Sequence, residues 1–116
     1  MARFSPAFVC VILFFTQDAA AREVTSEEAV ELMEECQRQR EVHIAPLREQ
    51  EIERCISGGR DRGHCERFNR DFGESYRLAN GYWQQGLFWD LPVCEDAYAA
   101  ERYFKMNPRA RSFTLP

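Results

Sequence analysis

The 116-residue sequence has no closely spaced cysteine pair, no recognised catalytic motif and no excess of positive charge. Structural zinc sites usually draw their ligands from C-x2-C pairs, and here at least nine residues separate neighbouring cysteines, so we expect no metal site. There is no G-x-S-x-G, H-E-x-x-H or glycine-rich phosphate loop, which leaves the sequence without a signature of an enzyme class. The net charge of −4 argues against a nucleic-acid partner, whose binding needs clustered positive charge.

The sequence also lacks an apolar run long enough to cross a membrane. Its longest run, Ala7–Phe15, has nine residues, whereas a transmembrane helix needs about 20. The run follows Arg3 and precedes Ala19 and Ala21, which is the arrangement of a secretory signal peptide. We therefore expect residues 1–21 to be a cleavable signal peptide, residues 22–104 to form a single helical domain and residues 105–116 to be a flexible tail. No stable membrane span is expected after cleavage.

The predicted mature chain retains four of the five cysteines, an even number. Export to an oxidising compartment predicts that these four form disulfides: Cys36, Cys55, Cys65 and Cys94. Four cysteines allow three pairings. The preferred pairing is Cys36–Cys55 with Cys65–Cys94, because Cys36 and Cys55 are nearly equidistant from a predicted turn at Pro46. Cys55 and Cys65 are equally symmetric about Gly58-Gly59, which supports Cys55–Cys65 with Cys36–Cys94.

Apolar spacing and capping residues predict an all-α fold. A capping box at Thr25 and Glu28 begins a helix that runs to about residue 41. Proline suits the first turn of a helix but not its interior, so we expect a second helix over 46–56, ended by Gly58-Gly59. Further helices are expected over 61–72 and from about Leu91 to 104. The prediction is a small disulfide-stapled bundle of about four helices, with a long aromatic-rich loop between the third and fourth.

That loop, residues 74–90, contains the turn signals Asn80-Gly81 and Gly86. An irregular ordered loop is preferred over a very short hairpin that would pair residues 82–83 with 87–89. Tyrosine and tryptophan are enriched in binding hot spots, although they also seal helical cores. Five aromatic residues are the candidate binding residues: Tyr76, Tyr82, Trp83, Phe88 and Trp89.

These features predict an exported, periplasmic or secreted, non-enzymatic interaction or accessory module. Its expected partner is a protein or a component of the cell envelope, and no cofactor or catalytic residue is assigned. One alternative is a small hydrolase-type enzyme that uses helix carboxylates with His64. Another is a thiol–disulfide redox protein, although the C-x-x-C motif is missing. The cluster of Arg60, Arg62, Arg67 and Arg70 is a further candidate, for an anionic ligand, although the spacing of Arg67 and Asp71 favours an ion pair between these two on one helix.

Overall fold

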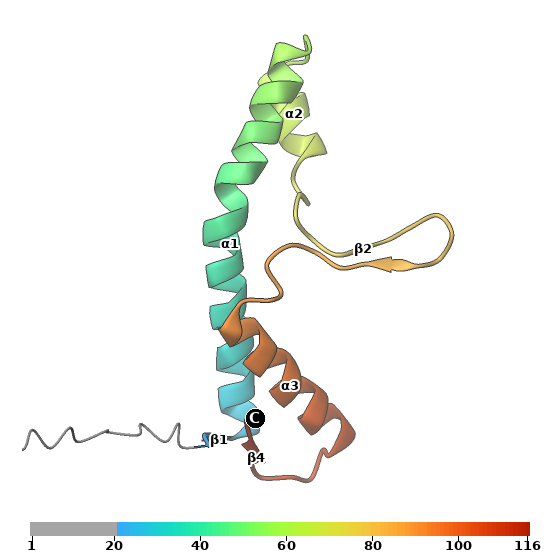
Figure 1. Cartoon of the computed structure of the whole chain (residues 1–116). Helices are drawn as coiled ribbons and strands as arrows, with labels where there is room; N and C mark the ends of the chain where they lie inside the picture. Colours follow the sequence, from blue (N-terminus) through green and yellow to red (C-terminus); the bar gives the residue numbers. More distant parts are fainter. Residues whose placement is uncertain (1–20) are drawn as a thin grey trace, which may run out of the picture.

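The computed structural model describes residues 21–116 and is built around one long helix (Figure 1). Three helices are present among these residues: α1 (Ser26–Ser57), α2 (Arg62–Phe68) and α3 (Pro92–Met106). Strand β1 (Glu23–Val24) pairs antiparallel with β4 (Phe113–Thr114), and β2 (Tyr76–Arg77) pairs antiparallel with β3 (Trp83–Gln84). Residues 1–20, and with them most of the predicted signal peptide, lie outside the described part of the chain.

The helix starts follow the sequence closely. The capping box of α1 is confirmed, because the Thr25 hydroxyl accepts the Glu28 N–H at 3.2 Å and the Glu28 carboxylate accepts the Thr25 N–H at 2.8 Å. Asp61 caps α2 by accepting the His64 N–H at 2.8 Å, but α2 ends at Phe68 rather than at the predicted residue 72. None of the helices in residues 21–116 combines the length and the apolar character needed to span a bilayer.

The predicted bundle of four helices is wrong. The described residues are mostly helical, about 56%, but hold three helices, because the two segments predicted on either side of Pro46 form the continuous helix α1. Pro46 has no N–H to donate to the Val42 carbonyl. Val42 is 73% exposed, so Pro46 interrupts the hydrogen bonding of α1 next to a residue that faces solvent.

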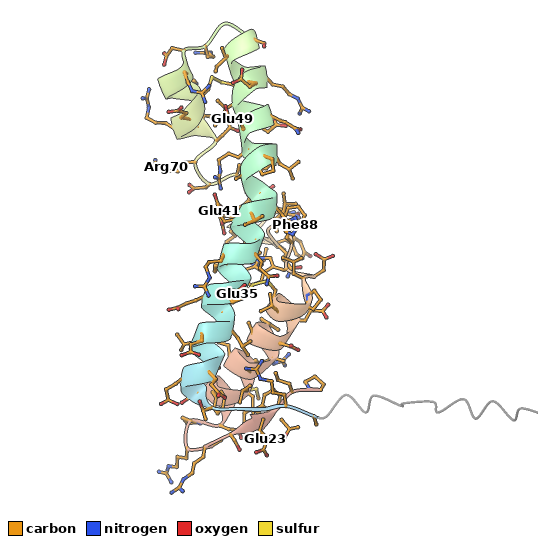
Figure 2. The ribbon with its side chains drawn as sticks, turned by 90° about the vertical axis from the view of Figure 1, so that its left-hand side faces the viewer. Glu23, Glu35, Glu41, Glu49, Arg70 and Phe88 are labelled. Atoms are coloured by element: carbon orange, nitrogen blue, oxygen red, sulfur yellow. A yellow bond between two sulfur atoms is a disulfide. The ribbon has the colours of Figure 1, made fainter. Side chains whose placement is uncertain are left out.

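An ion pair spans the proline. Arg48 donates from both terminal nitrogens to the two carboxylate oxygens of Glu41, at 2.7 and 2.9 Å. These residues are two turns apart on α1, one before and one after Pro46 (Glu41 is labelled in Figure 2). The hydrogen bond from Arg48 holds the pKa of Glu41 below its ordinary value. The stabilisation is therefore fully present above that ordinary value, and it is lost as the pH falls through the lowered pKa.

We expect Pro46→Ala to raise the free energy of unfolding by about 2 kcal/mol. Proline costs roughly 3 kcal/mol relative to alanine inside a helix, and replacing it returns roughly 1 kcal/mol of conformational freedom to the unfolded chain. Urea unfolding followed by circular dichroism measures the change. A loss of stability in Pro46→Ala would contradict a continuous α1.

The preferred disulfide pairing is also wrong, for the same reason. Cys36 and Cys55 lie 19 positions apart on one helix, about 28 Å at ~1.5 Å per residue, and a disulfide needs Cα atoms within about 7 Å. Instead, Cys36 joins Cys94 across α1 and α3, with their Cα atoms 4.8 Å apart. Cys55 joins Cys65 across the Gly58-Gly59 turn, with their Cα atoms 5.7 Å apart. This is the alternative pairing that the Gly-Gly symmetry supported.

The end of the chain belongs to the fold. Residues 105–116, which we expected to be a flexible tail, finish α3 and then return to the first turn of α1 (Figure 1). Phe113 in β4 stacks on Tyr103 of α3, with ring centroids 4.4 Å apart. Leu115 is 5% exposed and packs in a cluster with Val24 and Ala100. The β1–β4 pair connects α1 and α3 near the start of α1 (bottom of Figure 1), and the Cys36–Cys94 disulfide connects the two helices at the start of α3.

Candidate functional site: an exposed aromatic hairpin

The segment between α2 and α3 forms a β-hairpin, named here the aromatic hairpin (residues 76–84). It projects sideways from the middle of α1 (Figure 1). Tyr76 is paired with Gln84, and Arg77 with Trp83. The Leu78 N–H then donates to the Tyr82 carbonyl at 2.7 Å, which continues the pairing up to the turn.

The register differs from both sequence-based readings. Neither an irregular loop nor a pairing of 82–83 with 87–89 is present; the turn lies instead at Asn80-Gly81. The Gly81 N–H donates to the Leu78 carbonyl at 2.9 Å, and Gly81 has a φ of 86°. This is a three-residue hairpin loop with glycine at its left-handed position. The Asn80 side chain supports the turn by accepting the Tyr82 N–H at 3.1 Å. Of the two turn signals in this segment, Asn80-Gly81 is therefore the one that marks the hairpin turn.

The hairpin presents aromatic side chains on both faces. Successive strand residues point to opposite faces, so Tyr76 and Tyr82 share one face and Trp83 lies on the other. Tyr76 is 56% exposed, Tyr82 72% and Trp83 63%. The Arg77 guanidinium lies 5.9 Å from the centroid of the Trp83 ring, within reach of a cation–π interaction. These three aromatic residues therefore do not seal the helical core.

Phe88 and Trp89 are placed differently from the other three candidates. Phe88 stacks on His43 of α1, with ring centroids 5.1 Å apart, and Figure 2 shows it against the middle of that helix. Trp89 is partly buried and packs against the cluster of Cys36, Cys94 and Ala97. The structure thus separates the five predicted binding residues into three exposed on the hairpin and two packed against the helices.

A buried arginine, which the sequence analysis missed, anchors the base of the hairpin. The side chain of Arg40 in α1 is 1% exposed. It donates to the Leu87 carbonyl at 2.8 Å, the Gly73 carbonyl at 3.1 Å and the Gln37 side chain at 2.7 Å. Its guanidinium also lies 4.3 Å from the centroid of the Trp89 ring. Gly73 precedes the hairpin and Leu87 follows it, so the Arg40 side chain is hydrogen-bonded to the chain on both sides of the hairpin.

Two glycines allow the segments before and after the hairpin to lie close to each other and to α1. A Cβ at Gly86 would lie 2.5 Å from the Gly73 carbonyl oxygen and 2.9 Å from the Ser75 nitrogen. Gly73 has a φ of 84° and packs directly against Ile44 of α1. The Leu87 N–H donates to the Gly73 carbonyl at 2.9 Å, and the Gly86 N–H donates to the Ser75 hydroxyl at 2.8 Å. The base of the hairpin is therefore closely packed and hydrogen-bonded.

Cys65 and His64, which the enzymatic alternative brings together, have other partners in the structure. Cys65 is bonded to Cys55 and so is not a nucleophile beside His64. The His64 ring stacks on Phe68, with ring centroids 6.2 Å apart. Within residues 21–116, no three or more histidine, cysteine, aspartate or glutamate side chains are arranged so that they could hold a metal ion.

One arginine of the cluster considered for an anionic ligand, Arg62, is already neutralised by carboxylates. Arg62 contacts Glu49 at 2.7 Å, Glu66 at 2.8 Å and Glu53 at 3.1 Å. Hydrogen bonding to Glu49, and then to Glu53, raises the pKa of Arg62 above its ordinary value. An anionic ligand at this guanidinium would have to displace three carboxylates.

The chain matches no protein-family model, no curated protein and no solved structure. Fold and site together define residues 21–116 as a helical scaffold with two disulfides that displays an aromatic hairpin. The two disulfides are consistent with an extracellular or periplasmic protein.

Proposed function

We propose that this protein is an exported, non-enzymatic interaction module that binds a protein partner through the aromatic hairpin. The observation that carries the proposal is the exposure of Tyr76, Tyr82 and Trp83 on a hairpin whose base is fixed by Arg40. Large aromatic side chains contribute disproportionately to interface energy when a partner buries them. A fixed base lowers the entropy that is lost when such residues are ordered on binding.

The composition of the hairpin favours a protein partner. Tyrosine and tryptophan supply rigid, amphipathic contact area at low entropic cost. Arg77 beside Trp83, and Gln84 beside Tyr76, place hydrogen-bonding groups next to the apolar rings. Interfaces combine an apolar, aromatic centre with polar groups at the rim, and the hairpin provides both in nine residues.

Disulfides support the exported location in this proposal. Two disulfides in a domain of this size are typical of the periplasm or the cell exterior, where thiols are oxidised. The partner is accordingly sought among proteins of the same compartment.

The test compares partner capture by the wild-type protein and by Tyr82→Ser/Trp83→Ser, each purified as the full chain from the cells that produce it. Both side chains are largely exposed, so we expect the free energy of unfolding to change by less than about 0.5 kcal/mol. Each lost hot-spot residue costs about 2 kcal/mol or more, so we expect capture of the partner to fall at least tenfold.

Phe68→Ser is the matched control, because Phe68 is an aromatic residue of α2 that is 78% exposed and lies outside the hairpin. Capture by this variant is expected to equal that of the wild type. Equal capture by the hairpin variant would contradict the proposed function.

A further inference from the structure

A second surface, separate from the hairpin, lies between the N-terminal half of α1 and the C-terminal half of α3. It is a half-open groove of about 740 Å³ with a mostly apolar lining. Ala29, Val30 and Met33 of α1 contribute to it, together with Phe104 of α3. Val30, which lines this groove, is 59% exposed. The groove is an apolar helix–helix surface that residues 21–116 leave uncovered.

The border of this groove on α1 is acidic. Glu27, Glu31 and Glu34 follow one another at i, i+4 and i+7, a spacing that places them on one side of the helix. Glu34 lines the groove itself. None of the three forms an ion pair with another described residue. No basic residue occurs between Arg22 and Arg38, so we name these three residues the acidic stripe.

The basic residues that line the groove do not offset the acidic stripe. Arg38 is paired with Glu35 at 2.7 Å, and Lys105 is paired with Glu101 at 2.5 Å. The hydrogen bond that Lys105 donates to Glu101 raises the pKa of Lys105, so this ammonium stays charged and bound to its own carboxylate. The groove therefore carries apolar surface alongside unpaired negative charge.

We propose that this groove binds a cationic amphipathic helix of a partner protein. The apolar side of that helix would cover Val30, Met33 and Phe104, in the helix-in-groove mode of recognition. Lysine or arginine residues along one flank would face the acidic stripe. The bound helix would lie against both α1 and α3 as the third member of a helical bundle. This inference does not depend on the proposed role of the aromatic hairpin.

The same charges disfavour the other occupants. A second copy of this chain would bring its own acidic stripe to the interface, and like charges facing each other cost several kcal/mol. A fatty acid would add a carboxylate to a groove whose border already carries unpaired negative charge. Charge complementarity thus selects a basic partner over both a homodimer and an anionic lipid.

The probe is a fluorescein-labelled 18-residue peptide of leucine, alanine and lysine, arranged so that a helix has one apolar and one basic side. A second peptide has the same composition in scrambled order, so it keeps the charge but has no apolar side. Fluorescence anisotropy with the wild-type protein at about 50 mM salt is expected to give a dissociation constant at least tenfold lower for the amphipathic peptide. Equal binding of the two peptides would overturn the proposal.

Two variants separate the apolar and the charged contributions. Val30→Ser removes exposed apolar surface, and Glu31→Gln/Glu34→Gln removes two charges of the stripe; each is expected to weaken binding about tenfold. Glu95→Gln/Asp96→Asn, at the start of α3, changes the net charge equally but lies outside the groove, so its affinity should match that of the wild type. If both double variants weakened peptide binding equally, the loss would follow from the net charge of the protein and not from the acidic stripe, and the proposal would be overturned. A dimer of the free protein that Val30→Ser abolishes would assign the groove to a second copy and overturn it as well.

Discussion

Arg40→Met is expected to lower the free energy of unfolding by about 3–6 kcal/mol, because the Leu87 and Gly73 carbonyls each lose a hydrogen bond from a charged donor, which contributes about 1.5–3 kcal/mol. Methionine keeps much of the arginine side-chain length but has no N–H groups to donate. The Leu87 carbonyl loses a hydrogen bond of 2.8 Å, and Gln37 loses one of 2.7 Å. The segments before and after the aromatic hairpin are both hydrogen-bonded to this side chain. Without it, the two segments should separate at the hairpin base while the two disulfides remain intact.

Arg38→Met is the matched control, two residues earlier on the same helix. The Arg38 side chain is 65% exposed and pairs with Glu35, whereas the Arg40 side chain is 1% exposed. An exposed ion pair contributes about 0–1 kcal/mol, so this variant should unfold nearly as the wild type does. Urea unfolding followed by tryptophan fluorescence measures both variants, and hydrogen exchange at Gly86 and Leu87 reports on the hairpin base. Equal, small changes in the two variants would show that Arg40 does not anchor the hairpin.

Cys36→Ala/Cys94→Ala is expected to cost about 4 kcal/mol. The bridge encloses 58 positions of sequence, and the chain-entropy estimate for a loop of that length is about 4 kcal/mol. Both cysteines are fully buried and form the centre of one of the two core clusters. Losing the bridge should therefore loosen the junction of α1 and α3 as well as stabilise the unfolded state.

Cys55→Ala/Cys65→Ala provides the comparison within the same molecule. This bridge encloses 10 positions, for which the same estimate is about 3 kcal/mol, and it joins only α2 to the end of α1. Peptide mapping under non-reducing conditions should first recover Cys36–Cys94 and Cys55–Cys65. Recovery of a Cys36–Cys55 peptide, or a larger destabilisation from the shorter loop, would contradict the arrangement of the helices.

The local features of the fold were predictable because they depend on neighbouring residues. The capping box at Thr25, the cap at Asp61 and the start of α3 at Pro92 are all local in this sense. Proline inside a helix is different, because its effect depends on what stabilises the helix on both sides. The Glu41–Arg48 ion pair spans Pro46, and Ile44 lies next to Gly73 of the segment that follows α2; the second contact is not visible as a local pattern.

The candidate site was predictable in composition but not in geometry. The exposed aromatic residues come from the segment that the sequence marked, yet the register of the hairpin followed from Asn80-Gly81 rather than from the later Gly86. Arg40 escaped notice because an arginine among glutamines and glutamates is typical of a solvated helix face. Its burial depends on two carbonyls that lie 33 and 47 positions further along the chain. A pattern among neighbouring residues cannot predict contacts over such a separation.

Site-specific photocrosslinking tests the central claim, that the aromatic hairpin is the partner-binding surface, most directly. A photoreactive phenylalanine analogue replaces Trp83 in the full chain, and the same analogue replaces Phe68 as the control; both positions hold exposed aromatic residues. Irradiation in the producing cells is predicted to yield one discrete adduct with a partner protein from position 83 and none from position 68. No adduct from position 83, or the same products from both positions, would contradict the claim.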